Sequence, residues 1–379
     1  MKFVISKDDL VKGLTLGTKS MLIKSSLPIL ANALIKVSGN SVEMVTTSLE
    51  TAMRVKLGCR GERDGETTVL GRALVEFVAQ LGEGEVSFEK LGEEVLVSLG
   101  GTSARFATIS PEEFPAIPKV DGGRKIVLGA SEFSKSVSRV FFCAAQDESR
   151  PILAGVFFEG SKGGLSLVAT DGFRLGNSKV AATKNEFVGL KFVLPARSVG
   201  EIPKVVSEVS GDRESKQDIE MVISDNLTQA VFKIDNLEFT TRLIEGSYPQ
   251  WEKLIPANFA TKAILKKEEF MRAIKIAAIF ARDAGNIVKF KISTEGKSGF
   301  LAVSSNTAQI GSSDSKVEAH IEGGGGEIAF NFRYVLEALS SIDDEEVVFE
   351  MNESLNPGRL SPKGASSFFH IIMPVRLQN

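Results

Sequence analysis

Three stretches of this 379-residue chain align with one another without a gap, and this internal repeat constrains the fold more than any other feature. They read KFVISKDDLVKGL from Lys2, KIVLGASEFSKSV from Lys125 and KAILKKEEFMRAI from Lys262. Each pattern predicts a short apolar strand, a first helical turn with acidic residues and an amphipathic helix. The spacing between the starts is a domain length and far exceeds the ~20–50 residues of solenoid repeats. The chain is therefore predicted to contain three similar domains.

The second half of each repeat supports the same division. LGRALVEFV begins at Leu70, PARSVGEIP at Pro195 and NFRYVLEAL at Asn331, and all three share the pattern R-x-(L/V)-x-E. Each follows a short strand and precedes further alternating or apolar runs, so every repeat predicts strand, helix and several strands twice over. Short turns between strands allow hairpins but not the crossovers of parallel sheets. The predicted fold class is α+β, with three repeated domains that each pack two helices on antiparallel sheets.

Turn formers and polar residues mark the boundaries between the repeats. They collect in VDGGR at residues 120–124 and in IPANFATK at residues 255–262. The predicted domains therefore span residues 1–122, 123–256 and 257–379. The run EGGGGE in the third repeat is predicted to be a flexible hairpin loop.

Composition predicts a soluble cytoplasmic protein. The chain is 43% hydrophobic and 25% charged, with a net charge of −3, which is an ordinary globular balance. Charged residues from Lys7 to Asp9 interrupt any apolar start, so no secretory signal is expected. No run approaches the ~18 apolar residues of a membrane helix. The two cysteines, Cys59 and Cys143, are too far apart in the sequence to suggest a disulfide framework.

No motif indicates catalysis. The only histidines, His320 and His370, have no metal-ligand neighbours at a recognisable spacing, so neither a metal nor another cofactor is expected. GKS at residues 296–298 lacks the first glycine of a phosphate-binding loop, because Lys291 stands in its place. An enzyme with a paired-carboxylate site stays open as an alternative, since carboxylates are plentiful.

Cations recur at equivalent places in the repeats. Arg72, Arg197 and Arg333 each fall in the first turn of a predicted helix, where the helix dipole disfavours positive charge. A glutamate follows each arginine four residues later, which is the less favourable order for an ion pair. The arginines therefore either brace a sheet or a neighbouring domain or present positive potential to phosphates. A second column of cations would add to that potential: Lys12, Lys135 and Arg272.

The charge balance limits how tightly such a protein holds DNA. The pI of about 5.8 argues against a tight DNA-binding protein. It is compatible with a protein that surrounds DNA, because a few cations on one face suffice for weak, sequence-independent contact while an acidic exterior stays away from DNA.

One turn differs between the repeats. VATDGFRL at residues 168–175 predicts a strand, an Asp-Gly turn and then an aromatic ring, a cation and an apolar residue. The matching turns MVTTSLETA and LAVSSNTAQ lack counterparts of Phe173, Arg174 and Leu175. Repeated features build the scaffold, so the copy that differs is the expected place of a site. An ordinary turn between two strands is the alternative.

Essentially the whole chain resembles the β sliding clamp family of bacterial DNA polymerase III. The resemblance rests on MKFVISKDDL, SLPILANAL, VATDGFRL, SYPQWEKLIP and the ending IIMPVRL. It implies three similar domains in each subunit and a head-to-tail ring of two subunits around duplex DNA, with helices lining the hole. It implies no chemistry of its own but a tether that makes DNA replication processive. The alternative function is a repeat-built, β-rich protein for another ligand, such as a polysaccharide, without a role on DNA.

The resemblance also implies a set of partners. Double-stranded DNA is expected to be contacted without sequence preference, and no membrane is expected to be bound. The expected protein partners are a second copy of the chain, the catalytic subunit of DNA polymerase III, an ATP-driven clamp-loader complex, and other DNA polymerases and repair proteins that bind through short peptide motifs.

For DNA the resemblance adds Lys24 and Arg150 to the recurring cations, whereas Ile152 stands near a place where the family can have an aromatic residue. The predicted DNA-binding residues are Lys12, Lys24, Arg72, Lys135, Arg150, Arg197 and Arg272.

For the dimer the resemblance joins the strand ARFATIS of repeat one, as a free sheet edge, to repeat three. The alternative is that the residues concerned belong to the core of one domain. The predicted interface contains Arg105, Phe106, Thr108, Ile279 and Phe280.

The predicted pocket for partner peptides is built from the VATDGFRL turn, the last strand and neighbouring segments. Arg174 and Arg376 are expected to flank it and to meet a carboxylate or carbonyl of the peptide. Phe173 stands where the family often has histidine and Lys253 where it often has arginine, which leaves the pocket's detailed preferences open. The predicted pocket residues are Leu153, Thr170, Gly172, Phe173, Arg174, Leu175, Pro249, Lys253, Leu254, Asn331, Tyr334, Leu355, Pro357, Ile371, Ile372, Met373, Pro374, Val375, Arg376 and Leu377.

Overall fold

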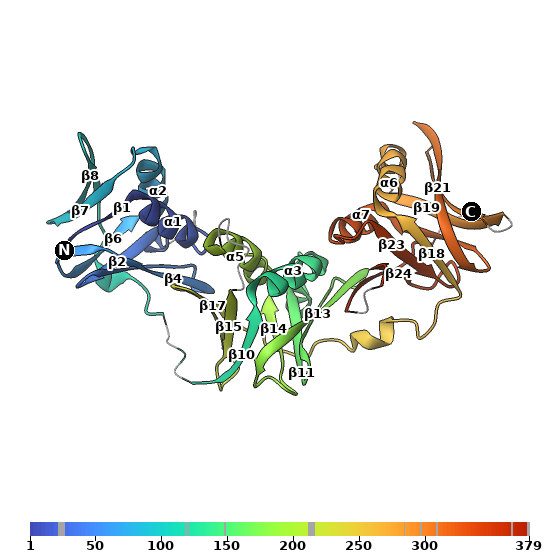
Figure 1. Cartoon of the computed structure of the whole chain (residues 1–379), viewed down its shortest axis with the longest axis horizontal. Coiled ribbons are helices and arrows are strands. Elements are labelled where there is room, and N and C mark those ends of the chain that lie inside the picture. The colour runs from blue at the N-terminus through green and yellow to red at the C-terminus, as the bar shows by residue number, and fades with distance from the viewer. Residues whose placement is uncertain are drawn as a thin grey trace. The chain divides into compact units, whose positions relative to one another are not determined.

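The computed structural model describes residues 1–21, 27–117, 120, 122–147, 149–210, 217–283, 285–295, 298–307, 310–364 and 367–376, and Figure 1 shows their course. The chain divides into two compact units. The first comprises Met1–Ser134, Ala182–Val188 and Glu201–Leu243, and the second comprises Lys135–Ala181, Gly189–Gly200 and Ile244–Asn379. Repeat two therefore contributes residues to both units.

The three aligned stretches each form a strand that runs directly into a helix, as predicted. They are β1 (Lys2–Ser6) with α1 (Lys7–Thr18), β10 (Arg124–Gly129) with α3 (Ala130–Val140), and β18 (Thr261–Lys266) with α6 (Lys267–Ala281). Acidic residues lie in the first turn of each helix, where they complement the positive end of the helix dipole. The apolar column of the alignment, Leu10, Phe133 and Phe270, is buried.

The R-x-(L/V)-x-E stretches also form helices after a strand. These are β6 (Gly65–Leu70) with α2 (Gly71–Gln80), β14 (Lys191–Pro195) with α4 (Ala196–Val199) and α5 (Ile202–Ser210), and β22 (Gly326–Asn331) with α7 (Phe332–Ser340). The middle copy is split near Gly200, where a Cβ would stand 2.8 Å from the Phe141 ring. Glycine at this position therefore lets the ring pack directly on the backbone.

Two series of antiparallel strands build the first unit. One is the sheet β5-β1-β7-β8-β9, with β5 (Arg60–Arg63), β7 (Glu85–Leu91), β8 (Glu94–Leu99) and β9 (Thr102–Ala107). The other runs β6-β2-β3-β4-β17-β16-β15-β10, with β2 (Asn32–Ser38), β3 (Ser41–Thr47), β4 (Thr51–Gly58), β17 (Leu237–Arg242), β16 (Gln229–Ile234) and β15 (Asp218–Ile223). The pairing of β4 with β17 joins repeat one to repeat two.

The second unit contains one continuous antiparallel series, β14-β11-β12-β13-β25-β24-β23-β18-β21-β20-β19-β22. Here the pairing of β13 with β25 joins repeat two to repeat three. The remaining strands are β11 (Gly155–Ser161), β12 (Gly164–Thr170), β13 (Arg174–Asn185), β19 (Ile287–Glu295), β20 (Ser298–Thr307), β21 (Gly311–Gly323), β23 (Glu346–Met351), β24 (Gly358–Pro362) and β25 (Phe368–Ile372). Short 3-10 helices in the chain are η1 (Pro28–Ala31), η2 (Pro111–Glu113), η3 (Phe141–Cys143), η4 (Pro151–Ala154) and η5 (Trp251–Leu254).

Strand β21 changes its partner along its length. Residues 311–319 pair with β20, and residues 319–323 pair with β18. The strand after it, β22, pairs with β19. The prediction of a hairpin loop at EGGGGE is therefore wrong, because β21 has already turned onto β18 where the glycines begin.

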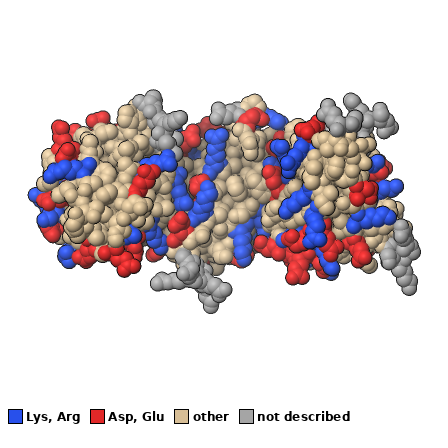
Figure 2. Space-filling model, turned by 90° about the horizontal axis from the view of Figure 1, so that it is seen from above, with Lys and Arg blue, Asp and Glu red and all other residues tan. Residues whose placement is uncertain are grey.

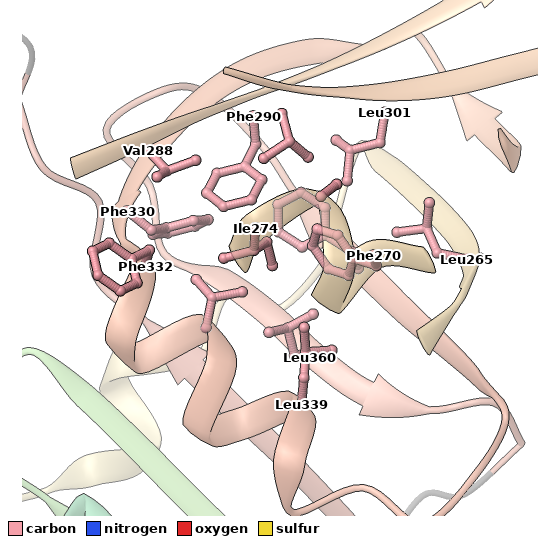
Figure 3. Packing of buried hydrophobic residues seen from close by; sticks show 14 of the residues in the cluster. Leu265, Phe270, Ile274, Val288, Phe290, Leu301, Phe330, Phe332, Leu339 and Leu360 are labelled. Atoms are coloured by element: carbon pink, nitrogen blue, oxygen red, sulfur yellow. The ribbon is translucent and has the colours of Figure 1, made fainter. Parts of the chain in front are cut away.

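The core of repeat three is built on phenylalanine rings (Figure 3). Phe270 of α6 lies 6.0 Å, between ring centroids, from Phe290 of β19, which lies 5.7 Å from Phe330 of β22. Helix α6 buries residues at the three- and four-residue spacing of an amphipathic helix, from Phe270 to Ala281. The equivalent Phe133 of α3 packs 6.0 Å from Phe232. The predicted helix periodicity therefore places its apolar face on the sheets.

Three further features of the described residues concern membranes, thiols and metals. No helix among them is long and apolar enough to cross a membrane. Both cysteines, Cys59 and Cys143, are free thiols. No group of three or more His, Cys, Asp or Glu side chains in the described ranges is arranged to hold a metal ion.

Candidate peptide-binding groove

The turn between β12 and β13 is held by its own side chains. Asp171 Oδ1 accepts hydrogen bonds from the N–H groups of Phe173 at 2.8 Å and Arg174 at 3.0 Å. Thr170 Oγ1 accepts from the N–H of Gly172 at 3.1 Å, and Gly172 has a φ of +92° that favours glycine. This geometry presents the Phe173 ring to solvent, with 60% of the residue exposed.

Arg174 points inward and has several partners within the second unit. Its guanidinium is paired with Asp171 at 3.1 Å and with Glu337, and it donates to the carbonyl of Phe142 at 2.7 Å. Its Cζ lies 4.6 Å from the centroid of the Tyr334 ring. Only 8% of the residue is exposed, so Arg174 supports the β12–β13 turn from inside the protein. This turn is the first wall of the predicted pocket. The expectation that it flanks the pocket and meets a peptide carboxylate is corrected by this burial.

The segment after β25 forms a second wall. The N–H of Met373 donates to the carbonyl of Phe173 at 2.8 Å, and the N–H of Val375 donates to the carbonyl of Ala329 in β22 at 2.8 Å. Pro374, between them, has no N–H to leave unpaired. Residues 373–375 are partly exposed beside the Phe173 turn, and Arg376 is exposed. Leu377 lies outside the described residues.

The segment after β17 forms a third wall. Its partly buried apolar residues include Tyr248, Trp251 and Leu254, which pack on the cluster of Phe157, Val168, Leu175, Val193 and Ile371. The N–H of Trp251 donates to the carbonyl of Pro249 at 2.8 Å, at the start of η5. This places Lys253 and Leu254 at the surface of the unit.

A groove of about 710 Å³ opens along the segments after β17 and after β25, and no residue of the Phe173 turn lines it. Its volume is within the ~300–1,000 Å³ typical of ligand sites. Leu355, with 57% of its area exposed, stands in the same β23–β24 turn as Pro357. The groove is lined by Lys253, Leu254, Ile255, Pro256, Ala260, Thr261, Gly324, Gly325, Asn352, Glu353, Asn356, Pro357 and Met373.

Several predicted pocket residues lie behind the surface instead of on it. Asn331 caps helix α7 by accepting a hydrogen bond from the N–H of Arg333 at 3.0 Å, and Tyr334 is partly buried beside Arg174. Asn331 and Tyr334 therefore shape the walls while each keeps part of its surface exposed. The buried members of the predicted set are Leu153, Thr170, Arg174, Leu175, Ile371 and Ile372.

His370 of β25 lies in a buried polar contact within the second unit. Its Nε2 lies 3.0 Å from Ser341 Oγ, and its Nδ1 lies 3.6 Å from Cys143 Sγ. Burial, helped by the positive charge of Arg174, lowers the pKa of His370 to about 3. The ring is therefore neutral in the folded protein at neutral pH.

We expect this histidine to make folding sensitive to acid. Its pKa rises from about 3 in the folded chain to roughly 6.5 in the unfolded chain. The contribution of this histidine to the free energy of unfolding is therefore fully present above pH ~6.5 and is lost as the pH falls towards 3. At pH 5 the loss from this group is about 2 kcal/mol. Urea unfolding followed at pH 7.5 and pH 5 should show a larger loss in the wild type than in His370→Asn. Parallel losses in both would contradict this assignment.

The family models decide what kind of protein carries this groove. Models of the N-terminal, central and C-terminal domains of the DNA polymerase III beta subunit match residues 1–118, 127–250 and 252–376. The chain belongs to the DNA polymerase III beta subunit family. Among its relatives, the beta sliding clamp of Staphylococcus aureus is 28% identical with 99% of both chains covered, and that of Synechocystis sp. is 25% identical with 100% of both covered.

Solved structures of the beta subunit family agree with this fold. A DNA polymerase sliding clamp from Bacillus subtilis superposes with a TM-score of 0.92 at 25% identity, and a DNA polymerase III beta subunit from Thermotoga maritima with a TM-score of 0.91 at 26% identity. Both comparisons cover 100% of each chain. The three-repeat α+β architecture predicted from the sequence is therefore confirmed.

The predicted DNA-binding cations of this family member are exposed, and some are already engaged. Lys12 Nζ donates to the carbonyl of Val209 at 3.3 Å, and Arg72 pairs with Glu76 at 3.1 Å. On the face shown in Figure 2, Lys and Arg side chains are interspersed with Asp and Glu, which suits weak contact. Lys24 lies outside the described residues. The exposed predicted cations are Lys12, Arg72, Lys135, Arg150, Arg197 and Arg272.

Sequence reasoning about this family member missed two neighbours of the VATDGFRL turn. Arg150, predicted to contact DNA, has its Nη1 3.5 Å from where a Cβ on Gly172 would stand, so it lies beside the turn that presents Phe173. Glu337 belongs to the recurring R-x-(L/V)-x-E pattern, yet its carboxylate pairs with Arg174, far away in the sequence. Arg174 of the VATDGFRL turn and the repeated Glu337 can both be recognised in the sequence, but only the fold shows that they pair.

Proposed function

We propose that this chain is a DNA sliding clamp. Two copies would close a ring around duplex DNA and hold the replicative polymerase on its template, with no reaction catalysed by the chain itself. The observation that carries the proposal is the match to all three beta-subunit domain models in order along the chain. The proposed domain boundary at residue 122 falls between the first two matched ranges, whereas the second and third ranges meet at residue 251, five residues before the proposed boundary at 256. A clamp works on the chromosome, so we place this chain in the cytoplasm.

The strand pairings support a head-to-tail dimer. Counted from the aligned starts, Thr51, Arg174 and Gly311 occupy the same position in β4, β13 and β21. The first two lie at junctions between repeats, where β4 pairs with β17 and β13 pairs with β25. In the described residues, the first half of β21 pairs on one side only, with β20.

Repeat one offers an edge strand that could pair with the free side of β21. Strand β9 of repeat one is the edge of its sheet and pairs only with β8 in the described residues. The strand ladders place Thr102, Leu237 and Phe368 at the same position, as the first residues of β9, β17 and β25. We infer that β9 of one chain pairs with β21 of a second chain, just as β17 and β25 pair within the chain.

The inferred pairing specifies a register. Thr51 faces Thr241 in the first junction, and Arg174 faces Ile372 in the second. The equivalent pair in a dimer is Gly311 opposite Phe106, followed by Asp314 opposite Ser103. Phe280 lies 4.0 Å from where a Cβ on Gly311 would stand, which supports the predicted place of α6 beside this interface.

The remaining partners follow from the groove and the cations. Exposed cations on helices of each repeat suit phosphate contacts without base recognition. The groove is lined by Leu254, Pro357 and Met373, and Met373 is bonded to the turn that exposes the Phe173 ring. This apolar surface suits the anchors of a short peptide. We propose that the polymerase III catalytic subunit, the clamp-loader complex, other polymerases and repair proteins use it in turn, since the flexible side chain of Met373 adapts to different anchors.

Retention on circular DNA tests the proposal. The chain, loaded by its ATP-driven loader onto a nicked plasmid, should stay bound during gel filtration and should be released when a restriction enzyme cuts the circle. A topological link explains this difference, because a ring slides off only where there is an end. Equal retention on circular and linear DNA would refute encirclement and favour a protein that binds another ligand.

A further inference from the structure

The groove continues past its apolar walls into a polar arm. We define this arm as the part lined by Thr261, Gly324, Gly325, Asn352, Glu353 and Asn356. None of these residues belongs to the predicted peptide pocket. The same continuous cavity is lined by Leu254, Pro357 and Met373, so whatever enters the pocket has a direct path into the polar arm.

The walls of the polar arm are tied together. Asn352 Oδ1 accepts from the N–H of Ala260 at 2.7 Å, while its Nδ2 donates to the carbonyl of Asn258 at 2.9 Å. Thr261 Oγ1 donates to the carbonyl of Gly325 at 2.9 Å. The linker end, the start of β18 and the glycine loop are therefore fixed to one another, and the polar arm is formed before any ligand arrives.

Gly324 is the one glycine of its run that the backbone does not require. Gly323, Gly325 and Gly326 have φ values of +104°, +79° and +153°, and a Cβ on each would stand within 3 Å of a neighbouring atom. Gly324 is outside the positive-φ set, and a Cβ there would meet nothing within 4 Å. The backbone therefore requires glycine at positions 323, 325 and 326. At position 324 the absence of a side chain leaves space in the groove that a larger residue would occupy.

Two charged side chains line the groove, Lys253 beside the apolar walls and Glu353 in the polar arm. In the described residues neither makes an ion pair within 4.0 Å. A carboxylate near the apolar anchors of a ligand and a cation beyond them would complement this order of charges.

We propose that the polar arm binds the segment that flanks a partner's apolar anchors, and that this segment carries a basic side chain which meets Glu353. This proposal rests on the proposed function, because it extends the same groove. It assigns Gly324 and Glu353 to partner selection: the pocket would hold any suitable anchor, and the polar arm would favour partners with a basic flank.

Peptides from the polymerase provide the test. Overlapping synthetic peptides spanning the DNA polymerase III catalytic subunit of the same organism are screened for binding to the full chain, and the shortest binder is compared with versions extended by four native residues at either end. Fluorescence anisotropy should show at least fivefold tighter binding for one extended version. Replacing its basic residue by alanine, or Glu353→Gln in the clamp, should remove most of this gain.

Variants at Gly324 separate the polar arm from the pocket. Gly324→Gln should cancel the gain from the extension while leaving the Kd of the shortest peptide within twofold, and Gly324→Ala, the matched control, should keep the gain. An extension that adds nothing in the wild type, or a gain that survives Gly324→Gln, would overturn the polar arm alone. Failure of every peptide to bind the wild type would overturn the proposed peptide docking as well.

Discussion

Ile279→Asp combined with Phe280→Ala is expected to turn the proposed dimer into folded monomers. Ile279 is 55% exposed on α6, so an aspartate there disturbs no core in the chain itself. At an interface, each buried apolar anchor contributes about 2 kcal/mol. A head-to-tail ring of two chains carries both substitutions in each of its two interfaces, so the dissociation constant should rise about a millionfold. Sedimentation velocity at micromolar concentration should show the monomer, and the variant should no longer stay on circular DNA.

Controls separate interface from stability in this experiment. Leu227→Asp also places a charge at an exposed leucine, 45% exposed in the β15–β16 turn, and should leave the dimer intact. If the α6 double variant sediments as a dimer, the interface lies elsewhere. Unchanged circular dichroism would show that the variant folds.

Engineered cysteines test the register of the same interface. Residues opposite one another in an antiparallel pair lie about 4.5–5.5 Å apart between Cα atoms, within the range of a disulfide. Ser103→Cys with Asp314→Cys, in a Cys59→Ser background, should therefore cross-link two chains under mild oxidation. Ser103→Cys with Ser312→Cys, displaced by roughly 7 Å along the strand, should not.

Deleting residues 373–379 is expected to abolish binding of polymerase peptides while dimerisation and DNA encirclement survive. The deletion removes the bonds from Met373 to Phe173 and from Val375 to Ala329, and with them one wall of the groove. Strand β25 ends at Ile372 and keeps its pairing with β13, so the core stays closed. Isothermal titration calorimetry with the shortest peptide measures the loss.

A milder change tests the turn to which Met373 is bonded. Phe173→Ala should weaken peptide binding by about 1–3 kcal/mol, as expected for an aromatic anchor at an interface. Leu49→Ala is the matched control, because Leu49 is 48% exposed in the corresponding turn of repeat one and lies outside the groove. If the truncation and Phe173→Ala both leave the affinity unchanged, the turn has no part in peptide binding.

Local sequence patterns were enough to predict the aligned helices and strands and the α+β class of the fold. The aligned strand–helix units, the helix ends and the Asp-Gly turn depend on interactions between residues close in the sequence. The buried column of Leu10, Phe133 and Phe270 follows from helix periodicity alone. The predicted residues of the groove, the DNA surface and the dimer interface stay predictions that the experiments above address.

Contacts between distant residues decided the rest. The glycine run was expected to join two paired strands, but β21 pairs with β18 at that point and β22 with β19. Arg174 was expected at the surface, but Glu337 and the carbonyl of Phe142 hold it inside. A buried charge is stable only with such partners, and their identity is invisible until the chain is folded.

The sequence by itself determined that the chain repeats a strand–helix–sheet unit three times and that one turn departs from the repeat. Apolar periodicity and turn chemistry act over a few residues, so both can be recognised from the order of the amino acids alone. The tertiary structure alone decided which sheet edges meet and which remain unpaired, and which side chains of the VATDGFRL turn face solvent. Those outcomes depend on strand register and on the burial of charge, and both are settled only when segments far apart in the sequence pack together.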